Sequence, residues 1–214
     1  NTINASTSAE LDASNVTTIS SSSIADVGTL LTNAVKDGDP DAREFTDGSF
    51  VNLGAVTLSD ATIAVGDLNT AISNANTVAT GATTKFTVSN GAALINAGDE
   101  AAFATLMGKE GAAGTDNINL TTQALTVTGT IASITNANNF TASTTGTVTG
   151  EIVNTTRVSA LTSLSNAQAN AKYTVTLNIA DSGTVTAGQL NRIDGGTTVA
   201  VDIGNITTLG ASDI

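Results

Sequence analysis

The chain has 214 residues and a formal net charge of −12 at pH 7, and it contains neither cysteine nor histidine. It therefore has no disulfide, no thiolate metal site, and none of the commonest general base near neutral pH. Its seven Lys and Arg residues are scattered, which argues against nucleic-acid binding, since that function needs clustered positive charge. No apolar run approaches the roughly 20 residues of a membrane helix, so we expect no membrane insertion.

The first third of the chain contains one helical pattern and one strongly charged segment. Ser23 precedes apolar residues that fall on one face of a helix, which predicts an N-cap at Ser23 and a helix behind it (Ile24, Val27, Leu30, Leu31, Val35). Residues 36–48 include the only proline and are expected to form an exposed loop. Strand-like patterns follow at 50–58 and 85–89, with a helix-like segment between them at 61–74.

The middle of the chain begins with its strongest helical pattern. Asp99 and Glu100 lie at the positive N-terminal end of a predicted helix over residues 99–109, where Phe103, Leu106 and Met107 share a face. Residues 118–149 predict short strands with little helix, and residues 158–164 predict another short helix.

Residues 173–209 carry a strand–helix–strand pattern. Apolar and polar residues alternate over 173–179 and again over 199–203, which predicts two strands. Mixed apolar spacings at 185–193 suit a short helix between them. Glycines mark the turns on both sides of that helix. The unit is about 25 residues from strand to strand, the size of one solenoid coil.

Degraded copies of this unit occur elsewhere in the chain. The segment Leu11–Ile19 (LDASNVTTI) is similar to Val201–Leu209 (VDIGNITTL). Parts of 56–69 are similar to parts of 175–191, and 148–156 is a weaker copy. Chance similarity in a chain rich in Thr, Ala, Asn and Val is the alternative, but order and spacing agree as well as composition, which favours true repetition.

These patterns predict a repeat solenoid that is β-rich with short helices. We expect a parallel β-sheet along one side, as in leucine-rich-repeat or β-helix proteins. We expect residues 1–214 to form a single elongated repeat domain, with a candidate internal boundary near 75–83. The alternative fold is a tandem pair of antiparallel β-sandwich modules, in which the apolar helical stretches would be loops.

The stretch VTLNIADSGTVTAGQLNRIDGGTTVAVDI resembles repeats in very large cell-surface and adhesin-like proteins of cyanobacteria. Similar repeats occur in structural proteins of the phages that infect them. The resemblance covers residues 173–209 and, more weakly, 11–19 and 56–69. It implies a displayed, architectural role and carries no catalytic residues.

One acidic segment suggests metal binding. Alternating carboxylates at Asp37, Asp39 and Asp41 are followed by Glu44 and Asp47, and oxygen ligands gathered in this way suit Ca²⁺. The helix–loop Ca²⁺ motif is only partly matched, and a solvated acidic loop remains the alternative. Calorimetry with millimolar Ca²⁺ tests the hypothesis, and a titration with no heat and an unchanged melting temperature would dispose of it.

We therefore expect a non-catalytic structural or adhesive protein, located extracellularly on a cell surface or on a virion surface. Its expected partners are copies of itself or neighbouring repeats of a longer chain, because related coils near both ends favour end-to-end assembly. The only methionine is Met107, so we expect the chain to be processed or a piece of something longer. The first alternative is a Ca²⁺-dependent module that binds surface carbohydrates, and a polysaccharide lyase or hydrolase is a third.

Overall fold

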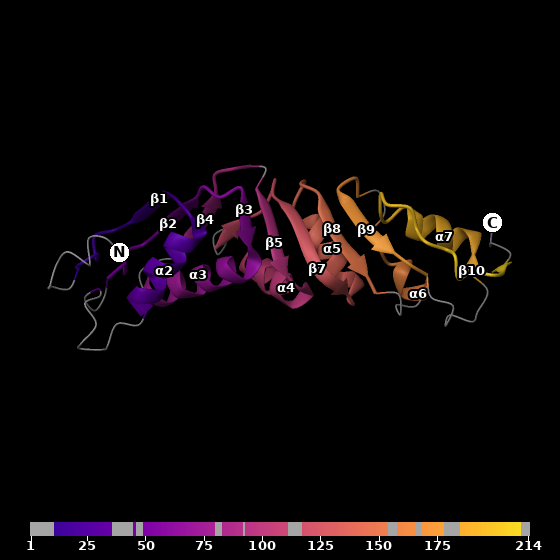
Figure 1. Cartoon of the computed structure of the whole chain (residues 1–214), viewed down its shortest axis with the longest axis horizontal. Helices are drawn as coiled ribbons and strands as arrows, with labels where there is room; N and C mark the ends of the chain where they lie inside the picture. Colours follow the sequence, from indigo (N-terminus) through magenta and orange to yellow (C-terminus); the bar gives the residue numbers. More distant parts are fainter. Residues whose placement is uncertain are drawn as a thin grey trace. The chain divides into compact units, whose positions relative to one another are not determined.

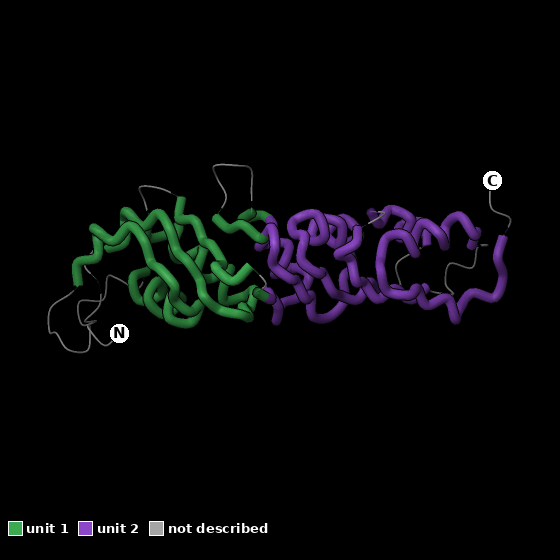
Figure 2. Tube along the Cα trace, turned by 90° about the horizontal axis from the view of Figure 1, so that it is seen from above, with its two compact units in different colours: residues 1–93, 108–120 green, residues 94–107, 121–214 purple. Residues whose placement is uncertain are grey.

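A computed structural model describes nine stretches of the chain: residues 11–35, 45, 49–79, 83–91, 93–110, 117–153, 158–165, 168–177 and 185–210. The chain divides into two compact units, shown in separate colours in Figure 2. Unit 1 comprises Asn1–Ala93 and Gly108–Leu120, and unit 2 comprises Leu94–Met107 and Thr121–Ile214. Residues 75–83, our candidate internal boundary, lie within unit 1.

Unit 1 is built on a parallel sheet. Its strands are β1 (Thr18–Ser22), β2 (Ala55–Leu58), β4 (Lys85–Val88) and β6 (Ile118–Asn119), adjacent in that order. A further short strand, β3 (Thr62–Ala64), leads directly into a helix. The two helices of the unit, α2 (Ile24–Val35) and α3 (Val65–Val78), pack against each other and lie below β1, β2 and β4 in Figure 1.

Unit 2 contains a second set of parallel strands. Adjacent in order are β5 (Leu94–Gly98), β7 (Ala124–Ile131), β8 (Val148–Ile152) and β9 (Ala171–Val175). A small parallel pair, β10 (Val185–Thr186) and β11 (Leu209–Gly210), follows. The helices are α4 (Glu100–Lys109), of which the first eight residues belong to the unit, then α5 (Ile134–Ala142), α6 (Val158–Leu161) and α7 (Ala187–Asp194).

The chain thus has an α/β fold with parallel sheets and short helices. Every strand pair described within a unit is parallel, so the antiparallel β-sandwich that we considered as an alternative is wrong for the described residues. Antiparallel pairing can be closed by a short hairpin, whereas these strands are separated by helices and long connections, as parallel pairing requires.

The core consists mainly of aliphatic side chains, which come from the helices as well as the strands. On the strands they occupy alternate positions. In β4, Phe86 and Val88 are buried, and in β9 the buried residues are Ala171, Tyr173 and Val175. The strand predicted at 85–89 is confirmed by β4, and the alternation predicted from residue 173 onward is confirmed for Tyr173 and Val175 of β9. Fully burying an aliphatic side chain of this kind contributes about 1.5–3 kcal/mol, so these faces are the main source of stability.

Polar side chains mark where several helices begin. Ser23 accepts a hydrogen bond from the N–H of Asp26 at the start of α2, which confirms the predicted N-cap. The Asp99 side chain caps α4 in the same way, because it accepts the N–H of Ala102. Thr186 and the Gln189 side chain form a reciprocal capping box at α7. Each cap satisfies backbone N–H groups that have no partner within the helix.

Helix α5 contradicts our expectation of little helix over residues 118–149. Three of its nine residues are Asn, which disfavours a helix interior and hides the pattern. Contacts at its N-terminus compensate, since Ser133 caps the first turn and the Glu100 carboxylate accepts the N–H groups of Ala132 and Ser133. Phe140 then anchors the helix in the core.

The strand expected at residues 199–203 is also wrong. Among the described residues, a single parallel bridge, between Thr176 and Asp202, joins this segment to a neighbour. A strand is stabilised by its partners, and no described strand lies on the other side of this segment.

Candidate interaction surface

The acidic residues that suggested a calcium site are Asp37, Asp39, Asp41, Glu44 and Asp47, and all five lie outside the described residues. The Ca²⁺ hypothesis therefore stays a prediction. Within the stretches that the structure describes, no group of three or more His, Cys, Asp or Glu side chains could hold a metal ion.

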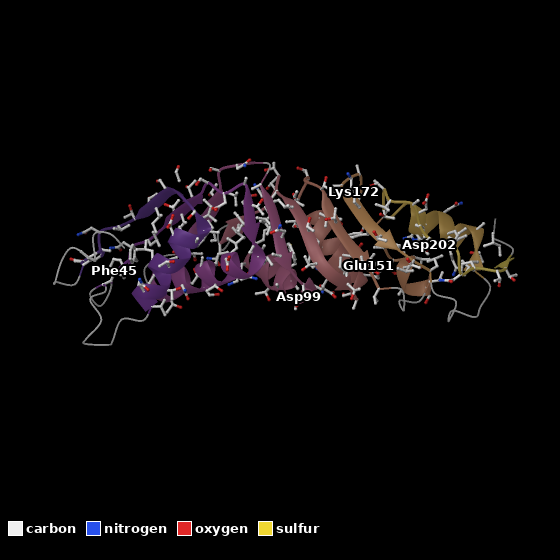
Figure 3. All side chains as sticks on the ribbon, in the orientation of Figure 1. Phe45, Asp99, Glu151, Lys172 and Asp202 are labelled. Atoms are coloured by element: carbon white, nitrogen blue, oxygen red, sulfur yellow. The ribbon has the colours of Figure 1, made fainter. Side chains whose placement is uncertain are left out.

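Several described carboxylates have structural partners. Asp60 accepts the N–H of Ile24 at 2.8 Å, at the N-terminus of α2. Glu100 accepts from the N–H of Ala132 at 2.7 Å and from the Asn136 side chain at 2.7 Å, at the N-terminus of α5. A carboxylate at this end of a helix is favoured by the helix dipole. Figure 3 labels three further acids at separate places in unit 2: Asp99 before α4, Glu151 in β8, and Asp202 outside the helices and strands.

Buried hydroxyl groups connect segments that are distant in sequence. Thr84, Thr144 and Thr197 each donate to a backbone carbonyl oxygen, at distances of 2.7, 2.6 and 2.8 Å. The acceptors, Leu53, Gln123 and Tyr173 respectively, lie 31, 21 and 24 residues earlier in the chain. The Ser49 hydroxyl group makes an equivalent bond to the carbonyl oxygen of Leu11, 38 residues earlier in the chain. We call these four side chains the hydroxyl column because each repeats the same type of bond to an earlier segment of the chain, two within unit 1 and two within unit 2.

Asparagine side chains make a second kind of connection. Asn52 donates to the Ser14 carbonyl oxygen at 2.8 Å, and Asn205 donates to the Leu177 carbonyl oxygen at 3.3 Å. Asn170 donates to three carbonyl oxygens, the shortest bond being 2.7 Å to Thr144. Each of these asparagines is the third residue of a turn that is closed by a backbone hydrogen bond (Phe50 with Leu53, Gln168 with Ala171, Ile203 with Ile206).

The two segments that we paired from the sequence share the same local structure. In Leu11–Ile19, Asp12 accepts the N–H of Ser14 at 2.9 Å, and in Val201–Leu209, Asp202 accepts the N–H of Gly204 at 2.8 Å. Hydrogen bonds from the Ser14 side chain and N–H hold the pKa of Asp12 below its ordinary value. Both segments continue into the same turn, closed by a bond from Val16 to Ala13 in one and from Ile206 to Ile203 in the other.

The segment from Val201 to Leu209 presents an open edge, a name we use for these nine residues. The N–H of Asp202 donates to the carbonyl oxygen of Val175, and the carbonyl oxygen of Asp202 accepts the N–H of Leu177, both at 2.9 Å. Alternate residues of a strand bond to opposite sides, so the neighbouring backbone groups of Val201 and Ile203 point away from that partner. Ile203 is 47% exposed and Leu209 is 56% exposed, whereas Val175 and Leu177 are at most 1% exposed.

Comparisons of the chain with protein-family models, with curated proteins and with solved structures gave no match. In the part of the chain that the structure describes, no helix is both long enough and apolar enough to cross a bilayer. The open edge and the bonds that connect distant segments are therefore the features from which a function can be argued.

Our sequence interpretation overlooked the hydroxyl column and the asparagine contacts. A signal was present, because Thr84, Thr144 and Thr197 each belong to a Thr-Thr pair near the start of a strand or extended segment. The pairs do not differ visibly from the exposed Thr-Thr pair at 207–208, so only the fold separates buried members from exposed ones.

Proposed function

We propose that this protein is a non-catalytic structural or adhesive component: a solenoid of stacked coils, displayed on a cell envelope, an extracellular filament or a virion. The observation that carries the proposal is the hydroxyl column. Each of its bonds ties one coil to a coil 21 to 38 residues earlier, and parallel strands join the same coils. Stacks of similar units of 20 to 45 residues, each in contact with its neighbours, define solenoid proteins.

Self-association is part of this proposal. A stack has ends, and an end exposes backbone groups and apolar side chains that every inner coil buries against a neighbour. The open edge has both properties, with Ile203 and Leu209 exposed and one side of the backbone unpaired among the described residues. The resemblance of residues 173–209 to surface and phage structural repeats agrees with a displayed role.

Localisation tests the displayed role directly. An antibody against the chain, used with gold labelling and electron microscopy on source cells and on purified filaments or virions, is expected to mark one of these surfaces. The matched control is the same labelling after the antibody has been adsorbed with purified protein. Label confined to the cell interior would contradict the proposal.

A further inference from the structure

We propose that the open edge binds the Leu11–Ile19 segment of a second copy of this chain, so that copies associate head to tail. The inference rests on the self-associating structural role proposed above. It adds the identity of the partner, the register of the contact and the residues on both sides.

The backbone of the open edge is prepared for one more parallel strand. Asp202 lies between Val175 and Leu177 of the preceding segment and bonds to both. The N–H and carbonyl oxygen of Val201 and the N–H of Ile203 have no partner among the described residues and point to the other side. An incoming residue that sits as Asp202 does would bond to these groups in the same way.

Asp12 of a second copy is that residue. It occupies the position of Asp202 in a segment of similar sequence, and both aspartates accept the N–H two residues ahead, at 2.9 and 2.8 Å. Both segments then make the same closed turn. Because the conformation is already formed in both segments, docking needs little ordering of the backbone, which lowers the cost of association.

Asn15 supplies a specific polar contact. Its counterparts Asn52 and Asn205 each donate to a carbonyl oxygen of the preceding segment. Asn15 is exposed and makes no hydrogen bond to any other residue that the structure describes. Asp202 is bridged to Thr176, and Asn205 donates to the carbonyl oxygen of Leu177, the next residue after Thr176. With Asp12 of the second copy opposite Asp202, the docked Asn15 amide therefore donates to the Ile203 carbonyl oxygen of the first copy.

Apolar contacts accompany this bond. The same register stacks Ile19 of the second copy on Leu209 and Val16 on Ile206. All four side chains have apolar surface that the contact can remove from water. Leu209 is 56% exposed, and the other three are half-buried. Of the described large apolar side chains, three are exposed, and two of them, Ile203 and Leu209, lie on the open edge.

Repulsion between negative charges opposes the contact and makes its strength depend on salt concentration. The register brings Asp12 of one copy beside Asp202 of the other, and each copy has a net charge of −12. Repulsion between such exposed charges is screened by salt, with a screening length of about 10 Å at 0.1 M. Association is therefore expected to strengthen as the salt concentration rises.

Two different surfaces meet in this contact, so it is heterologous. Each copy that docks presents a new open edge of its own, and such contacts extend into a chain of copies unless the rotation closes a ring.

Sedimentation velocity over a range of protein concentrations tests the proposal. The unaltered chain is expected to form a concentration-dependent series of oligomers. Ile203→Glu on the open edge and Asn15→Glu on the docking segment should each weaken association at least tenfold. Both residues are exposed, so neither change should unfold the protein.

Matched controls carry the same charge change elsewhere. Val35→Glu alters the third exposed large apolar side chain, at the end of α2, and Asn191→Glu alters an exposed asparagine of α7. Both controls should associate like the unaltered chain. Association weakened by Val35→Glu as much as by Ile203→Glu would overturn the proposal.

Mixing the variants tests the head-to-tail arrangement. The Asn15→Glu chain keeps its open edge, and the Ile203→Glu chain keeps its docking segment, so the mixture should form one-to-one dimers and stop there. A mixture that stays monomeric, or an unaltered chain that is monomeric at every concentration, would overturn the inference. The displayed role is tested independently by localisation, and gold label confined to the cell interior would contradict it whatever the association experiments show.

Discussion

The phenolic oxygen of Tyr173 donates a 2.6 Å hydrogen bond to the carbonyl oxygen of Ala137, which lies 36 residues earlier in the chain. The bond joins strand β9 to helix α5 within unit 2, and both residues are buried. Tyr173 is the only tyrosine of the chain, so its spectroscopic and titration behaviour can be assigned without ambiguity.

Removal of this hydroxyl group should lower stability by a moderate amount. Tyr173→Phe keeps the ring in the core and loses one buried hydrogen bond, which is worth about 0.5–1.5 kcal/mol. Tyr173→Ala should cost more, about 3–5 kcal/mol, because it also leaves a cavity. Urea denaturation measures both changes in the free energy of unfolding, and equal losses would show that the ring contributes nothing.

The stability of the protein should fall in alkaline solution, and Tyr173 should account for part of the fall. Burial raises the pKa of Tyr173 in the folded state above its ordinary value of about 10. Its contribution is complete below pH about 10 and is lost as the pH rises toward the folded pKa, because the unfolded chain releases the proton first.

One such group changes the free energy of unfolding by at most about 1.4 kcal/mol per pH unit. Denaturation curves at several alkaline pH values, for the unaltered chain and for Tyr173→Phe, isolate it by difference. The two proteins differ only at residue 173, so the contributions of all other groups cancel in the difference. Parallel stability curves for the two proteins would refute the assignment.

The hydroxyl column should be necessary for stability. Thr84→Val and Thr197→Val keep the shape of the side chain and leave the carbonyl oxygens of Leu53 and Tyr173 without their hydroxyl donor. Each change should cost about 1–3 kcal/mol. The control is Thr207→Val, at an exposed position, which should change stability by less than about 0.5 kcal/mol. Thermal denaturation of the three variants decides whether buried and exposed threonines differ.

Close packing of the backbone at Gly146 should make this glycine irreplaceable. A Cβ atom there would lie 2.6 Å from the carbonyl carbon of Gln123 and 2.7 Å from the carbonyl oxygen of Thr122. Both are backbone atoms, which cannot move away as a flexible side chain can. Gly146→Ala should therefore lower the free energy of unfolding by about 1–3 kcal/mol or more.

Gly28 provides the matched comparison for that substitution. It lies inside α2, and an added Cβ would meet nothing within 4 Å. Gly28→Ala should therefore stabilise the protein by about 0.5–1 kcal/mol, because alanine favours a helix. Melting temperatures that shift in the same direction for both variants would contradict the packing argument.

The sequence by itself determined the local structure wherever neighbours in the chain supply the cause. The alternation of Tyr173 with Val175 identified a buried strand face, and Ser23 identified the start of α2, because strand period and helix capping act over a few residues. The similarity of residues 11–19 to 201–209 predicted related segments, and the hydrogen bonds of Asp12 and Asp202 show that the two share a local structure that was not predicted.

Only the tertiary structure decided the features whose causes lie far away in the chain. Helix α5 begins directly after Ala132 and Ser133, whose N–H groups donate to the carboxylate of Glu100, more than 30 residues earlier in the chain. Thr84 is buried and Thr207 is exposed, although both stand in Thr-Thr pairs. Residues 199–203 have the pattern of a strand and do not form one. A strand is held by hydrogen bonds to its neighbours, and among the described residues this segment has a neighbour on one side only.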